Sequence, residues 1–242
     1  MAGGLLAGSG LEENLFTVLV ESTESKTVFE ERGGKRLLDR IRSGDLSRGG
    51  YVVVADGGDT RFFIVAYNGR IVYAEASQAG RLVKGDEALR LLEGYNATLR
   101  VGVGRLRPRL VEWSPSLSVY VRGIDLQHRQ LINTLNSLYQ ALLLGGERRQ
   151  VGWTLGFLEE YSRFHFRTEE NFLQRHGYPQ LEQHRREHRW FVEKVNRLRE
   201  EHRRGERELG LEMLAFLARW VRGHIAGSDR RYAEWLRSKG LA

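Results

Sequence analysis

The sequence predicts a small α+β domain followed by an all-α, up-and-down four-helix bundle. Up to about Val103, short β-branched and aromatic runs alternate with turn residues, which is typical of antiparallel strands. After Pro115, apolar residues recur at helical spacing over long stretches. The length of 242 residues exceeds one ordinary domain and favours two. The boundary is expected in a linker over residues 105–116, which gives domains of residues 1–110 and 111–242.

The first half carries short elements separated by strong turn signals. Asn68-Gly69 between two β-branched runs predicts a tight hairpin, and Asp86 is expected to cap a short helix. The predicted strands are Leu15–Val20, Tyr51–Ala55, Arg61–Ala66, Arg70–Ala76 and Ala97–Val103. The predicted helices are Lys35–Ile41 and residues 87–92.

The second half predicts four long helices with short connections, which is the pattern of an up-and-down bundle. The first begins near Asp125, and the third runs from Pro179 to about Arg203. The fourth covers residues 206–225 and resumes near residue 229. The second has an apolar face marked by Leu155, Leu158, Tyr161, Phe164 and Phe172.

Composition excludes several classes of site. The absence of cysteine excludes disulfides, thiol nucleophiles and thiolate metal sites, so any metal must use His, Asp or Glu. Of the net charge of +7, +6 comes from residues 113–242, where arginine pairs are scattered among glutamates as on a solvated helix face, a pattern that disfavours nucleic-acid binding. Apolar runs are too short to span a membrane, and no basic segment precedes Leu5-Leu6, so we expect a cytoplasmic protein without a membrane partner.

All seven histidines lie in the predicted bundle, and several are paired at helical spacing. His165 and Glu169 are four apart, as are His184 and His188, so each pair projects from one helical face. His224 and Asp229 are five apart, which places them about 140° apart on a regular helix. These two side chains converge only if the helix bends or ends between them, and Gly227 is the expected place. The first helix contributes His128.

Each of these motifs alone is compatible with a surface pair or a hydrogen-bonded core histidine. Their joint occurrence predicts that all four helices send ligands inward, namely His128, His165, Glu169, His184, His188, His224 and Asp229. This set is too large for one tetrahedral zinc and matches two metals that share carboxylates.

These motifs resemble those of the hemerythrin family over residues 112–238, from EWSPSLSVYVRGIDLQH to HIAGSDRRY. The resemblance implies an oxo- or hydroxo-bridged pair of iron ions. One iron would be bound by His184, His188 and His224 and the other by His128 and His165, with Glu169 and Asp229 as bridges. His176 and His202 match no ligand motif, and we expect them at the surface.

Further positions match family residues near the cluster. Tyr232 matches a tyrosine beside the metals, while Trp113, Phe166, Trp220 and Val221 match residues that line the ligand pocket. The family commonly carries Leu at the position of Val221. A plain role in the bundle core is equally compatible with these four positions.

The resemblance implies a protein that reversibly binds O2, or another small diatomic ligand or peroxide. The fused first domain suggests oxygen or redox sensing, with residues 1–110 as an output or interaction module that binds an unknown protein or a second copy. One alternative is an enzyme, a di-iron peroxidase or a scavenger of O2 or NO. A nucleic-acid-binding regulator is a third hypothesis.

Overall fold

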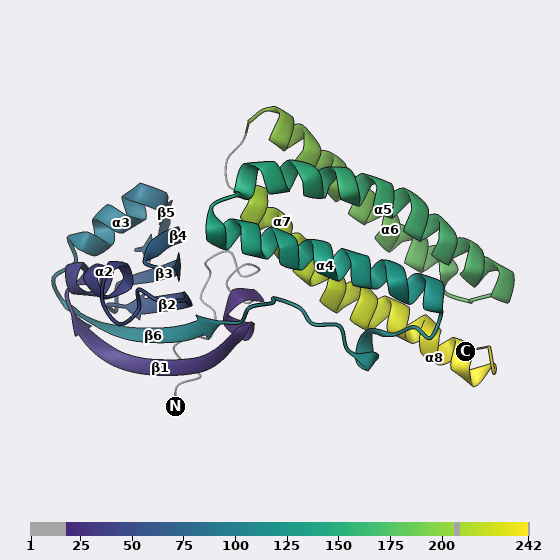
Figure 1. Cartoon of the computed structure of the whole chain (residues 1–242), viewed down its shortest axis with the longest axis horizontal. Coiled ribbons are helices and arrows are strands. Elements are labelled where there is room, and N and C mark those ends of the chain that lie inside the picture. Colours follow the sequence, from purple (N-terminus) through teal and green to yellow (C-terminus); the bar gives the residue numbers. More distant parts are fainter. Residues whose placement is uncertain (1–17, 206–208, 242) are drawn as a thin grey trace. The chain divides into compact units, whose positions relative to one another are not determined.

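The computed structural model describes residues 18–205 and 209–241, which form two compact units (Figure 1). One unit holds the strands and the short helices together with Leu142–Gly145, and the other holds the rest of the long helices. This architecture confirms an α+β region followed by a helical bundle.

The first unit is built on one six-stranded antiparallel sheet. The strands are β1 (Thr23–Arg32), β2 (Gly50–Asp56), β3 (Thr60–Tyr67), β4 (Arg70–Gln78), β5 (Arg81–Lys84) and β6 (Thr98–Leu106). Their order is β1-β6-β2-β3-β4-β5, so the last strand of the chain returns between the first two. The predicted hairpin is confirmed: Tyr67 pairs with Arg70, and Asn68 and Gly69 both adopt positive φ.

Two helices pack on this sheet. Helix α2 (Gly34–Arg42) contributes Leu37, Leu38 and Ile41 to the core, and α3 (Gly85–Glu93) contributes Ala88 and Leu92. These side chains pack against apolar residues of β2, β3, β4 and β6. The two helices and one face of the sheet thus enclose an apolar core.

The structure corrects three expectations for this region. Residues 18–21 are helical rather than extended, and residues 15–17 of that predicted strand lie outside the described residues. A short apolar run cannot by itself distinguish a strand from a buried helix. Strands β1 and β5 were not predicted, because both lie at sheet edges and are largely polar. Asp86 lies in the first turn of α3, whose N-cap is Lys84.

The second unit contains four long helical segments. After a 3-10 turn, η1 (Pro115–Leu117), come α4 (Arg122–Leu144), α5 (Glu147–His176) and α6 (Leu181–Arg203). The fourth segment is α7 (Leu209–Trp220), η2 (Val221–Asp229) and α8 (Arg230–Ser238) without interruption. Figure 1 shows these segments running alongside one another, which confirms the up-and-down bundle.

Details of the bundle differ from the expectations. Pro179 precedes α6, whose N-cap is Gln180, and Phe164 is 66% exposed rather than part of the apolar face. The fourth segment does not end at Gly227 but continues through it as the π-helix η2, which is the distortion between His224 and Asp229. None of the helices in the described ranges is both long and apolar enough to cross a membrane.

Candidate metal centre

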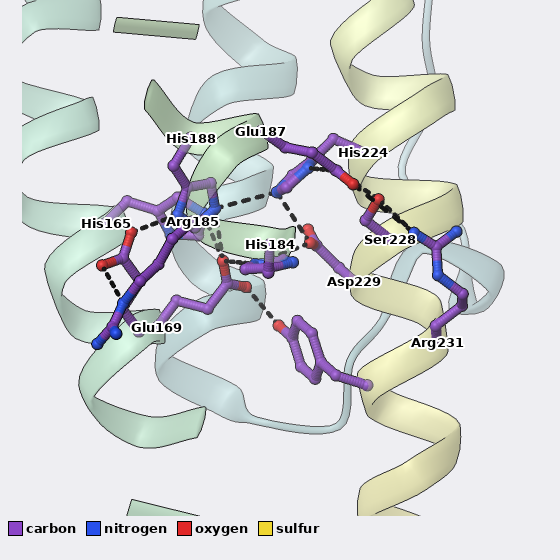
Figure 2. Close-up of polar contacts among 12 residues, drawn as sticks. His165, Glu169, His184, Arg185, Glu187, His188, His224, Ser228, Asp229 and Arg231 are labelled. Carbon is purple, nitrogen blue, oxygen red and sulfur yellow. Dashed lines mark hydrogen bonds and ion pairs between the residues drawn. The ribbon is translucent and has the colours of Figure 1, made fainter. Parts of the chain in front are cut away.

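The seven predicted ligand side chains meet inside the bundle. They come from α4, α5, α6 and η2, and each is at most 3% exposed: His128, His165, Glu169, His184, His188, His224 and Asp229. Figure 2 shows the imidazoles of α5, α6 and η2 facing one another around the two carboxylates. The bundle thus buries a set of nitrogen and oxygen donors that has no apolar packing role.

The donors form two groups that share one carboxylate. In the first, ligand atoms of Glu169, His184, His188 and His224 all lie within 4.8 Å of one another. In the second, Glu169 is grouped in the same way with His128 and His165. A carboxylate common to both groups has the position that a bridging ligand requires.

Asp229 lies between the two groups from the opposite side of the bundle. Its Oδ1 is 3.0 Å from Nε2 of His224, and its Oδ2 is 3.3 Å from Nε2 of His128. The π-helix explains how Asp229 reaches this place. Its hydrogen bonds join residues five apart, so His224 and Asp229 become neighbours along one face.

Three of the imidazoles are oriented by hydrogen bonds at Nδ1. The acceptors are Gln127 Oε1 for His165 at 2.7 Å, Glu170 Oε1 for His188 at 2.8 Å, and Glu187 Oε2 for His224 at 2.7 Å. An Nδ1–H donor fixes the tautomer and leaves Nε2 as a free electron-pair donor. The sequence prediction missed these acceptors, although each lies beside a ligand in the chain, in QH, EE and EH pairs.

The same ring orientations point two nitrogens at one another, as two ligands of one cation would be. Nε2 of His188 and Nε2 of His224 face each other at 3.1 Å. Without a metal this contact is a hydrogen bond, because Glu169 and Glu170 raise the pKa of His188 against its burial and so favour a proton on its ring. Other buried ring nitrogens and carboxylate oxygens lack any hydrogen bond within the described part of the chain: both nitrogens of His128, Nε2 of His165 and both oxygens of Asp229. These residues therefore fit a metal centre.

Comparisons with known proteins agree with this geometry. Residues 119–236 match the model of the hemerythrin HHE cation-binding domain. A bacteriohemerythrin of Stenotrophomonas maltophilia is 33% identical over 129 residues, which cover 53% of this chain and 83% of that protein. The chain belongs to the hemerythrin family.

Two further relatives and one solved structure also match about half of the chain. A Clostridium acetobutylicum bacteriohemerythrin is 29% identical over 50% of this chain and 98% of its own length. The alpha subunit of hemerythrin from Lingula anatina is 28% identical over 52% of this chain and 94% of its own length. A crystal structure of a hemerythrin mutant aligns with a TM-score of 0.47 at 28% identity, over 52% of this chain and 95% of that one. All four matches cover about half of the chain.

Glu169 and Glu170 raise the pKa of His188 in the hemerythrin-like cluster, whereas three other histidines are governed by burial. Burial lowers the pKa of His128 to about 4 and that of His224 to about 3, and lowers the pKa of His165 well below its usual value. Burial opposes ionisation of Glu169, but His165 and the hydrogen-bonding imidazoles of α6 outweigh it and hold its pKa well below normal. Burial, reinforced by Glu169, raises the pKa of Asp229 well above its usual range. Neutral imidazoles are the form that binds metals.

Two of the predicted pocket residues contact histidines of the cluster, and a third is buried next to one of them in the chain. Phe166 stacks on His188 with ring centroids 3.8 Å apart, and Trp220 stacks on His224 at 3.9 Å. Val221 is 1% exposed at the start of η2. Phe166 and Trp220, with Val221 next to Trp220 in the chain, form an apolar wall on the three-histidine side.

The remaining predicted residues lie in different surroundings. The Tyr232 hydroxyl donates a hydrogen bond to Glu169 Oε1, so it touches the shared carboxylate. Trp113 is partly buried in the segment before α4, and the Arg129 guanidinium lies 4.5 Å from its ring centroid. Two histidines outside the cluster are partly exposed, His176 and His202.

Proposed function

We propose that this chain is a non-haem di-iron protein that reversibly binds O2 in the cytoplasm and serves in oxygen or redox sensing. In this proposal residues 111–242 form the metal domain, and residues 1–110 are the output or interaction module. Support for iron and O2 comes from membership of the hemerythrin family together with the buried donor set. Support for sensing comes from the fused sheet unit, which O2 binding alone does not require.

Each donor has a proposed role. His184, His188 and His224 hold one iron, and His128 and His165 hold the other. Glu169 and Asp229 bridge the two, because each lies between the two groups of histidines. When bound, the pair of ferrous ions supplies the electrons that O2 takes up on binding and returns on release. The two-histidine side has fewer protein ligands and therefore keeps a position for O2.

The observation that carries the proposal is the mutual orientation of His188 and His224. Their Nε2 atoms meet at 3.1 Å while carboxylates accept hydrogen bonds from both Nδ1 atoms. A bound cation would take the place of the proton that the two Nε2 atoms share in its absence. Five imidazoles and two carboxylates also donate less charge than the Glu-rich sites of ferritin-like bundles, which favours reversible binding over vigorous oxidation.

The side chains around the donors have supporting roles. Tyr232 holds Glu169 through its hydroxyl, and the imidazoles keep their tautomers through Gln127, Glu170 and Glu187. The buried side chains of Phe166, Trp220 and Val221 are proposed to limit the access of water to the cluster.

An absorption spectrum tests the proposal. The chain is produced with ample iron, reduced without air, exposed to O2 and then deoxygenated. We expect about two irons per chain and a visible charge-transfer band that appears in air and disappears on deoxygenation. One zinc per chain, or a spectrum unchanged by O2, would contradict the proposal. Sustained turnover of peroxide with a reductant, without stable cycling, would favour the peroxidase alternative.

A fragment tests the proposed division into domains. Residues 109–242 contain every proposed ligand, so this fragment is expected to be folded and to give the same spectrum as the full chain. A fragment that stays unfolded with iron present would show that the boundary is wrong.

A further inference from the structure

A groove on the surface of the bundle reaches the three-histidine group. It has a volume of about 660 Å³, within the usual range for small-molecule sites, and lies between α6 and the α7–η2 segment. Trp220 and the proposed ligand His224 both line it. Its other lining residues are Gln183, Arg186, Glu187, Trp190, Arg219 and Gly223. The groove therefore gives an outside molecule access to the edge of the metal centre.

Three aromatic rings connect the groove to the cluster. Trp190 is 49% exposed and stacks on Trp220, with ring centroids 6.4 Å apart and planes inclined by 18°. Trp220 in turn stacks on His224 at 3.9 Å and 17°. An exposed indole beside a groove is a platform on which a planar heterocycle can stack. The same rings form a continuous π-stacked route from that platform to a proposed metal ligand.

The charges in the groove favour an anion. Arg186 and Arg219 are exposed and form no ion pair with any residue in the described ranges. Glu187, the acidic residue of the lining, is already engaged, because it accepts hydrogen bonds from His224 and Ser228. Figure 2 shows its carboxylate directed at these two side chains. Two unpaired guanidinium groups are suited to a phosphate.

We propose that this groove binds flavin mononucleotide in its reduced form, with the ring system on Trp190 and the phosphate at Arg186 and Arg219. The bound hydroquinone loses two electrons and two protons and becomes oxidised flavin. The electrons pass through Trp220 and His224 and reduce two ferric ions to ferrous, and the protons go to water. A flavin suits this site better than a nicotinamide, because a hydride donor must touch its acceptor whereas a flavin also releases single electrons. The electron-transfer part rests on the proposed di-iron function, and the binding part does not.

Calorimetric titration of flavin mononucleotide into the metal-loaded full chain tests the binding. We expect one site per chain, with affinity reduced about tenfold by Trp190→Leu. Arg186→Gln and Arg219→Gln are each expected to weaken binding severalfold, and riboflavin, which lacks the phosphate, to bind more weakly than the mononucleotide. Matched controls are Trp153→Leu, an indole 56% exposed on α5, and Arg175→Gln, an exposed arginine of the same helix.

Rapid mixing without air tests the electron route. Reduced flavin mononucleotide should re-reduce the oxidised protein several times more slowly in Trp190→Leu than in the parent, whereas reduction by dithionite should be unchanged. Absence of flavin binding, or equal binding by parent and Trp190→Leu, would overturn the proposal. Calorimetry measures flavin binding independently of the O2 spectrum. A chain that binds flavin but not O2 would therefore contradict the proposed function and leave the flavin site supported.

Discussion

The two halves of the metal centre are buried equally but are oriented by different groups. On the three-histidine side, the carboxylates of Glu170 and Glu187 accept the Nδ1 hydrogen bonds of His188 and His224. On the two-histidine side, His165 is held by the neutral amide of Gln127, and His128 has no hydrogen bond to any described residue. A carboxylate makes an imidazole more basic than an amide does. The three-histidine side is therefore expected to bind its metal more tightly, while the other side keeps an exchangeable position.

Removal of the shared carboxylate should weaken iron binding in both halves of the site. In Glu169→Ala, both halves lose a ligand, so iron should fall from about two per chain to less than about half of one. The matched control is His202→Ala, which changes a histidine outside the cluster. Elemental analysis of both purified proteins measures the effect. Iron contents that are equal in the two variants would exclude Glu169 as a bridge.

Substitution of the residues that orient the imidazoles should weaken metal binding on one side of the site at a time. Glu187→Gln keeps the shape of the side chain but removes its charge, and we expect about a 10- to 100-fold loss of metal affinity on the three-histidine side. Gln127→Leu should cost less than about tenfold, on the other side. Glu193→Gln, at an exposed position of α6, controls for the loss of a carboxylate. Competition with a coloured chelator gives the metal affinities. A larger loss of affinity in Gln127→Leu than in Glu187→Gln would contradict the expectation that the three-histidine side binds its metal more tightly.

Gradual metal removal should occur in two steps. A chelator in slight excess is expected to take the iron of the two-histidine side first and leave about one iron per chain. Complete removal leaves the buried donors without a cation, so the helical unit should unfold at a lower temperature. Iron content and circular dichroism followed together test this order. Simultaneous loss of both irons at every chelator concentration would contradict it.

The smallest predicted effect concerns the apolar wall. Val221 has one methylene less than the Leu common in the family, a difference of about 0.8 kcal/mol in buried contact, so the pocket is expected to admit more water. Val221→Leu should lengthen the lifetime of the O2-bound form in air severalfold. The decay of the visible band measures this lifetime. An unchanged or shorter lifetime would indicate that Phe166 and Trp220 already exclude water.

Sequence spacing predicted the cluster because most of its ligands lie on regular helices. His165 with Glu169, and His184 with His188, needed only the four-residue repeat. Spacing predicted that the helix must be distorted for Asp229 to join them, but not that the distortion is a π-helix, which has no simple signal in the sequence. Helical spacing also placed Phe164 on the apolar face of α5, where it is in fact exposed, because spacing does not show where a buried face ends.

The sheet was predictable where strands are central and apolar. Strand β2 and strand β3 pair along their whole length and have continuous buried runs, which is the pattern that propensity detects. Strand β1 is held by pairing with β6 and carries mostly exposed polar side chains, so its own sequence gives little indication. Long-range pairing, rather than local preference, determines such edge strands.

A Mössbauer spectrum of the oxidised chain, loaded with isotopically enriched iron, tests the central claim most directly. Two ferric ions in unequal surroundings, one with three histidines and one with two, should give two resolved quadrupole doublets of equal area. Exchange coupling through the bridges should leave the pair without a paramagnetic signal. A single doublet, or an uncoupled ferric signal from one iron per chain, would contradict a bridged and unequal di-iron centre.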